Sequence, residues 1–129
     1  MQLMKIPVVA SSTLVDNKFF YINVEDVFEI EGAVSGADTS IIRFSAGASD
    51  SLVTVTFDGA TAAEKVLNAK KFADYFADKC AELNGPNANR KPVNRVFNLI
   101  PSLGEFETLT GITKTGGSGG DAIKTIALS

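Results

Sequence analysis

The sequence contains no histidine and only one cysteine, Cys80. Without histidine the chain lacks the commonest general base, the commonest metal ligand and any Ser-His-Asp or Cys-His pair. One thiol can form no disulfide within the chain and cannot build a thiolate zinc site. We therefore expect a protein that is not an enzyme, with no catalytic residue, no cofactor, no metal ion and no small-molecule substrate.

Long apolar runs are also missing. The apolar run at residues 6–10 is too short for a signal peptide, and no segment approaches the roughly 20 apolar residues of a membrane span. We expect a soluble protein made in the cytoplasm, with no membrane partner. A net charge of −3 argues against bulk nucleic acid as the main partner. The 129 residues, 45% of them hydrophobic, predict one globular domain over residues 1–129.

Residues 61–84 predict one amphipathic helix of about six turns. Thr61 and Glu64 have the T-x-x-E spacing of a capping box, and Gly85 and Pro86 follow as a stop signal. Apolar residues recur at intervals of three and four along one face, which a partner layer must cover. The predicted inner stripe consists of Ala62, Val66, Ala69, Ala73, Phe76, Cys80 and Leu83, widened by Leu67 and Phe72, with Asn68 on the polar surface.

The small residues on this stripe have a structural meaning. Its three alanines indicate that the helix closely approaches a flat surface, most simply a sheet. Cys80, on the same stripe, is predicted to be a small buried hydrophobe rather than a reactive thiol.

Strand-like segments precede the helix. Residues 1–10 predict an opening strand or arm, which Pro7 restricts to a sheet edge or a role outside the sheet. Residues 11–17 predict a polar turn. Residues 40–45 and 51–57 are β-branched and aromatic runs joined by a small polar connection, which predicts a hairpin.

Residues 18–31 carry the clearest strand signal. Apolar residues share one parity, from Phe20 to Phe28 and Ile30, and Phe19 and Tyr21 fall on the outward parity. Asp26 interrupts the apolar parity, which predicts a bulge, a bend or a brief break near that residue.

The segment after the helix is harder to assign. Residues 93–100 are compatible with a strand or a short helical turn, and residues 105–113 alternate loosely and predict a strand. The glycines at 116–120 predict a flexible linker. Residues 122–128 return to apolar alternation and predict a last strand, free to pair locally or on a neighbouring molecule.

Two short motifs have residue types that can bind a ligand. Glu25, Asp26, Glu29 and Glu31 could hold calcium or magnesium, but a solvated strand face is favoured because no loop has ligand spacing. The glycines at 116–120 are no phosphate loop, because no Lys-Ser/Thr pair follows them.

A basic cluster leaves two interpretations open. Beside the outward Phe19 and Tyr21 it is typical of a single-strand-binding surface, where bases stack on rings and phosphates meet lysine. A solvated helix face is favoured, because acidic residues are interleaved with the lysines. The basic residues are Lys70, Lys71, Lys79, Arg90, Lys91 and Arg95.

The order of the elements resembles small virion-associated structural proteins of tailed phages, particularly marine ones. Residues 21–24 (Tyr-Ile-Asn-Val) and 26–30 (Asp-Val-Phe-Glu-Ile) resemble two of their strands, followed by a Thr-rich strand at 53–57 and an Ala-rich helix. The resemblance implies a component of a head or tail assembly, such as a capsid decoration or neck accessory protein, located in the virion. The element order is also similar to single-stranded-DNA-binding modules of the PC4 and Whirly kind, which would imply nucleic acid as the partner and a cytoplasmic location.

From this we expect an α+β fold: an antiparallel sheet of about four or more strands, the 61–84 helix packed on one face, and a C-terminal strand acting as an arm. Within the single domain we distinguish an N-terminal strand or arm (1–17), a core (18–85), an irregular or strand segment (86–115) and the tether with its terminal strand (116–129). The expected partners are further copies of the chain, a major capsid protein or a tail protein. The expected contact residues are Phe19, Tyr21, Ile123, Ile126 and Leu128.

Overall fold

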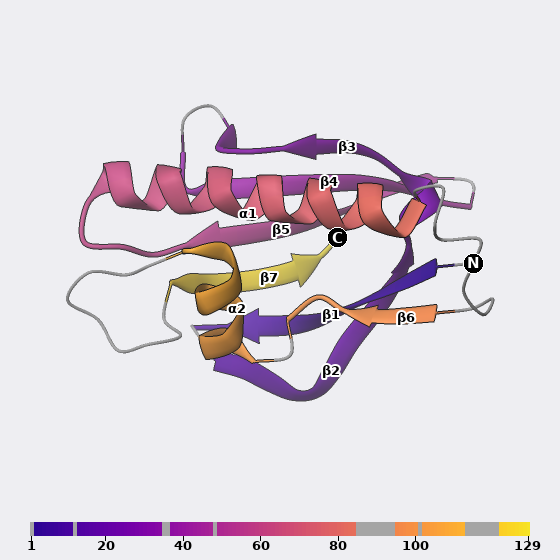
Figure 1. The fold of residues 1–129 in the computed structure, drawn as a ribbon, viewed down its shortest axis with the longest axis horizontal. Coiled ribbons are helices and arrows are strands. Elements are labelled where there is room, and N and C mark those ends of the chain that lie inside the picture. Colours follow the sequence, from indigo (N-terminus) through magenta and orange to yellow (C-terminus); the bar gives the residue numbers. More distant parts are fainter. Residues whose placement is uncertain are drawn as a thin grey trace.

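The computed structural model describes residues 2–11, 13–34, 37–47, 49–84, 95–100, 102–112 and 122–129. A mixed sheet lies beside one long helix and one short helix (Figure 1). In chain order the elements are β1 (Gln2–Ala10), β2 (Thr13–Asn23), η1 (Val24–Asp26, a 3-10 turn), β3 (Val27–Glu31), β4 (Thr39–Ala46), β5 (Ser49–Phe57), α1 (Ala62–Asn84), β6 (Arg95–Asn98), α2 (Leu103–Thr110) and β7 (Ile123–Leu128).

The strands form one sheet in the order β2-β1-β7-β5-β4-β3, and β6 pairs with β1. All pairings are antiparallel except that of β6, which runs parallel to β1. This arrangement, with α1 on one face, confirms the predicted α+β class and the predicted hairpin, which is β4–β5.

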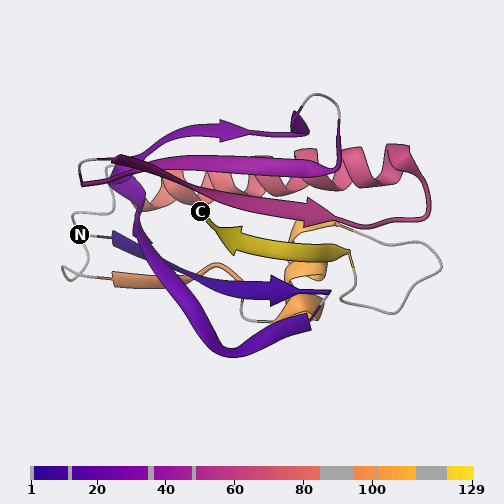
Figure 2. The same ribbon diagram turned by 180° about the vertical axis from the view of Figure 1, so that it is seen from behind.

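The two edge strands are consecutive in the chain. Only the three residues of η1 separate β2 from β3, so the edges come within about 14 Å of each other at that end. The sheet is therefore curled, with α1 along its inner face, and Figure 2 shows the outer face with α1 behind the strands.

Helix α1 begins and ends almost where the sequence predicts. Its capping box is present in a shifted form: Thr61 Oγ1 accepts a hydrogen bond from the Glu64 N–H at 3.1 Å, while Glu64 Oε1 accepts one from the Ala60 N–H at 3.2 Å. The predicted close approach to the sheet is confirmed, because Ser40 Oγ on β4 donates to the Ala69 carbonyl at 2.8 Å. Only small residues allow a strand side chain to reach the helix backbone.

The predicted burial of the first residues of the helix stripe is wrong. Ala62 is exposed and Leu67 is 50% exposed, because the first turns of α1 extend past the ends of β4 and β5 in both views. Asn68, predicted on the polar surface, is instead buried, and its Nδ2 donates to the Asp58 carbonyl at 3.2 Å. This hydrogen bond lets an amide replace an apolar residue in the core.

The predicted break in the segment 18–31 is confirmed as η1, where the Asn23 side chain accepts from the Glu25 N–H at 3.1 Å. The predicted turn at residues 11–17 is too long: β2 already starts at Thr13. Phe28 is 54% exposed rather than inward, because the β3–β4 register slips by one residue between Val27 and Glu29.

β1 is an interior strand and not an edge or arm, despite Pro7. It pairs with β2 on one side, and on the other with β6 over Gln2–Lys5 and with β7 at Val9. Among the described residues, Pro7 therefore lies in the gap between two partners. There a missing N–H costs the ladder no hydrogen bond.

The C-terminal segment forms the predicted strand but does not act as an arm. β7 lies between β1 and β5, in the middle of the sheet. Ile123 is 1% exposed and Ile126 is 0% exposed, so the expectation that they contact another molecule is wrong: they fill the core of their own chain. Leu128 is the last residue of β7, and its side chain is 49% exposed. The linker at 116–120 lies outside the described residues.

The segment predicted as a strand at 105–113 is helix α2 instead. Ser102 caps it by accepting from the Glu105 N–H at 3.2 Å, and Gly111 ends it with φ 75°, donating its N–H to the Glu107 carbonyl at 2.8 Å. These are an N-cap and a glycine C-cap. The alternatives left open for 93–100 are decided in favour of a strand, β6.

The core lies between the curled sheet and the two helices. Four fully buried phenylalanines, Phe57, Phe72, Phe76 and Phe106, link β5, α1 and α2. Cys80 is buried, as predicted, and burial raises its pKa from 9.0 to about 11. Within the described part of the chain, no helix is both long and apolar enough to cross a membrane.

A candidate protein-contact surface on β2

Two aromatic side chains stand side by side on the outer face of β2. Phe19 is 45% exposed and Tyr21 is 48% exposed, and their ring centroids lie 5.5 Å apart at an edge-to-face angle of 80°. Their neighbour Ile22 points into the core. Alternation along the strand therefore places both rings on the face opposite α1, as the sequence predicts.

Lys5, on the neighbouring strand, completes this group. It is the cross-strand partner of Tyr21, and its Nζ lies 4.1 Å from the centroid of the Phe19 ring. An ammonium group over a ring face is held by a cation–π interaction of about 0.5–1 kcal/mol at an exposed site. The two rings and Lys5, hereafter the aromatic patch, form an ordered and partly apolar surface.

A wide bulge in β2 adjoins the aromatic patch. Pro7 pairs with Phe19 and Val9 with Leu14, so four residues of β2 lie opposite Val8 alone. Asn17, within this bulge, has φ 59°, in the left-handed region that asparagine tolerates better than most residues.

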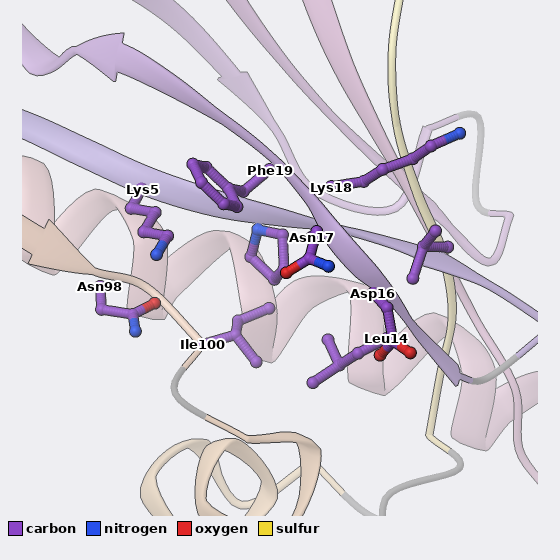
Figure 3. A pocket seen from close by; sticks show the side chains of 10 residues that line it. Lys5, Leu14, Asp16, Asn17, Lys18, Phe19, Asn98 and Ile100 are labelled. Carbon is purple, nitrogen blue, oxygen red and sulfur yellow. The ribbon is translucent and has the colours of Figure 1, made fainter.

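The bulge opens a pocket of about 290 Å³ (Figure 3). Leu14 and the buried Ile100 line one part of it, and Lys5, Asn98 and Phe19 line another, while Lys18 extends away. This lining can hold a side chain with an apolar body and a polar tip. In the part of the chain that the structure describes, no group of three His, Cys, Asp or Glu residues is placed so that it could hold a metal ion.

The two edges of the sheet differ in charge. On β2, no charged residue occurs between Phe19 and Asn23. On β3, Glu29 and Glu31 alternate with apolar residues, and Glu29 Oε1 lies 2.9 Å from Arg43 Nε. Charged side chains on an edge strand discourage pairing with other chains. The β3 edge has such charges, while this part of the β2 edge has none.

The three helix lysines of the basic cluster do not form one surface with the aromatic patch. Lys71 Nζ donates to the Gly111 carbonyl at 2.9 Å, and Lys79 Nζ lies 3.1 Å from Glu82 Oε2. Lys70 instead packs beside Gly32. All three are on α1, which covers the opposite face of the sheet. Arg90 and Lys91 lie outside the described residues, and Arg95 begins β6.

Sequence reasoning missed two surface features. The first is the bulge in β2 with Lys5 beside the rings. The bulge contains Asn17 in the left-handed conformation, but no sequence pattern around Asn17 indicates a bulge. The second is an apolar hollow at the start of α1, lined by Ala62, Ala63, Val66, Leu67 and Lys70. Its residues fit the helical period, so periodicity assigned Ala62, Val66 and Leu67 to the buried face.

Comparisons with protein-family models, with curated proteins and with solved structures found no match for this chain.

Proposed function

We propose that this chain is a non-enzymatic structural protein that acts by assembling with copies of itself or with another protein. The observation that carries the proposal is the aromatic patch, where Phe19 and Tyr21 stand half-exposed and adjacent on a sheet face that none of the described helices covers. Aromatic residues are enriched at protein interfaces because they combine a large apolar area with few rotatable bonds.

The size of the exposed rings supports a contact role. An aromatic side chain buries about 150–250 Å², so a half-exposed ring leaves about 100 Å² uncovered. Covering that area contributes about 2 kcal/mol for each ring, before the costs of association. This gain opposes the entropy lost on association, and the edge-to-face arrangement of the rings is already in place within one chain.

A virion is the setting that the resemblance implies. There the protein would be a head or tail component, such as a capsid decoration protein or a neck or tail accessory protein, and its partner a major capsid or tail protein or another copy of itself. The support for this setting is the resemblance of residues 21–30, 53–57 and the α1 segment. Residues 21–24 lie on the strand that carries the patch.

Size-exclusion chromatography with light scattering tests the proposal. We expect the wild-type mass to rise above the 13.6 kDa of one chain as concentration increases. The double substitution Phe19→Ser and Tyr21→Ser should return it to one chain. The matched control is Leu109→Ser, since Leu109 on α2 is 63% exposed, and it should leave the mass unchanged. One chain at every concentration, or an equal effect of the control, contradicts self-assembly through the patch.

A single-stranded nucleic-acid binder is the second candidate, and Lys5 beside the rings is the observation that favours it. Bases could stack on Tyr21 while a phosphate meets the ammonium group of Lys5. A fluorescently labelled oligonucleotide separates the candidates: binding through phosphate contacts weakens steeply as salt rises. Salt-sensitive binding that the Phe19→Ser and Tyr21→Ser variant loses would favour this candidate over assembly.

A further inference from the structure

The free edge of β2 offers a strand-pairing surface. Among the described residues no strand pairs with the side of β2 that faces away from β1. In Figure 2 the strand crosses in front of its neighbours, with no described element over it. Building on the proposed function, we propose that the partner is a second copy of this chain, paired antiparallel along β2, with Phe19 of each copy opposite Tyr21 of the other.

The geometry of a two-fold antiparallel pair selects this register. Residues directly opposite each other point to the same face of the sheet. With Phe19 opposite Tyr21, Phe20 lies opposite its own copy and Ile22 lies opposite Lys18. Both cross-strand pairs on the outer face are then aromatic, and such pairs contribute about 0.2–1 kcal/mol each. The contact is isologous, so it closes as a dimer.

The charges that flank the pairing segment are compatible with an antiparallel partner. Asp16 and Lys18 precede the uncharged stretch, and Glu25 and Asp26 follow it in η1. In the proposed register Lys18 lies opposite Ile22 of the other copy and Asp16 lies opposite Val24, so no charged residue lies directly opposite a like charge. Parallel pairing would instead align each Lys18 with its own copy, and like charges repel.

The other edge of the sheet does not offer the same contact. In a two-fold pairing of β3 centred on Glu29, that carboxylate would lie opposite itself, and a shift of one pair would place it opposite Glu31. Both registers put like charges directly opposite each other, which is destabilising. The register that pairs all five residues of β3 is therefore disfavoured, which makes β2 the better edge for self-pairing.

The contact is small. The four half-exposed rings contribute about 400 Å² in total, which is a third of the roughly 1,200 Å² at which stable interfaces begin. A contact with so small an apolar area exchanges rapidly, so light scattering needs high protein concentration and the register is best trapped covalently.

Two variants with one added cysteine each, Phe19→Cys and Tyr21→Cys, trap the register. One variant is labelled with nitrogen-15, the two are mixed and mildly oxidised, and mass spectrometry identifies the disulfides. The Cβ atoms of directly opposite residues lie about 5 Å apart, which is close to disulfide range. In the proposed register the same-position residues are diagonal neighbours, two residues along the strand, and lie about 7–8 Å apart. The mixed dimer keeps one Tyr21–Phe19 pair. Wild-type protein is the control for Cys80, which is buried.

We expect disulfides between positions 19 and 21 to predominate over the two same-position disulfides. Predominance of either same-position disulfide overturns the register. Absence of all three, while light scattering shows wild-type protein above 13.6 kDa, overturns pairing through β2 but leaves the proposed assembly function intact. A wild-type mass of one chain at every concentration, with no disulfide formed, overturns both pairing through β2 and the self-assembly on which it rests.

Discussion

The position of β7 at the centre of the sheet makes a sharp prediction for Ile126. A free C-terminal arm could lose a large side chain without unfolding the domain. In the structure, however, Ile126 is 0% exposed and pairs with Val55 on β5 and Val9 on β1. The substitution Ile126→Ala should therefore create a cavity at the centre of the core.

The magnitude follows from burial. Replacing a fully buried isoleucine by alanine costs about 2–5 kcal/mol, because transfer and cavity terms add. Leu128, two residues on, is the matched control: it points to the same face but is 49% exposed. About half of a leucine's burial free energy of about 1.5–3 kcal/mol is at stake there, so Leu128→Ala should cost about 1 kcal/mol.

Urea unfolding followed by far-ultraviolet circular dichroism measures both variants. With a slope of about 1.5 kcal/mol per molar urea, Ile126→Ala should lower the midpoint by about 2 M and Leu128→Ala by less than about 1 M. Equal midpoints for the two variants would refute the central position of β7, and would restore the interpretation of residues 122–128 as an arm.

Two further predictions concern single residues away from the contact surface. Gly111→Ala should lower the free energy of unfolding by about 1 kcal/mol, because the Gly111 φ of 75° is strained for alanine. The control is Gly32→Ala, where the nearest atom to the added Cβ would lie at an ordinary contact distance of 3.8 Å. It should change the free energy of unfolding by less than about 0.5 kcal/mol. Equal costs in chemical denaturation would contradict this. Burial raises the pKa of Cys80 from 9.0 to about 11, so the unfolded chain loses the thiol proton first, and this contribution to stability should fall between about pH 9 and pH 11. The slope should be shallower in Cys80→Ala, and an unchanged slope would show that other groups account for it.

Local signals carried most of the correct fold predictions. The α1 cap, the break at η1 and the β4–β5 hairpin each depend on residues close together in the sequence, such as Thr61 with Glu64. The helix α2 was missed although its signals are also local: Ser102 and Gly111 mark its two ends, but the loose apolar alternation between them favoured a strand. There a wrong choice of period overrode the cap residues.

Non-local pairing explains the remaining errors. A strand's period of two shows which residues share a face, but not which strand lies beside it. Residues 122–128 alternate like an edge strand or an interior one, so nothing local places β7 between β1 and β5. Pro7 indicated an edge for β1, and only the interrupted pairing around Pro7 explains its interior place. The same limit applies to the contact surface: parity placed Phe19 and Tyr21 outward, while neighbouring strands bury Ile123 and Ile126.

Hydrogen–deuterium exchange at low and high protein concentration tests the central claim, that the β2 edge is the assembly surface, without any substitution. Among the described residues no strand pairs with the backbone amides of β2 that point away from β1, so protection that grows with concentration reports a second chain. The account predicts slower exchange at high concentration in peptides that cover residues 18–23, with no change across β3. Protection confined to β3 or to α1, or exchange that is independent of concentration throughout, would contradict it.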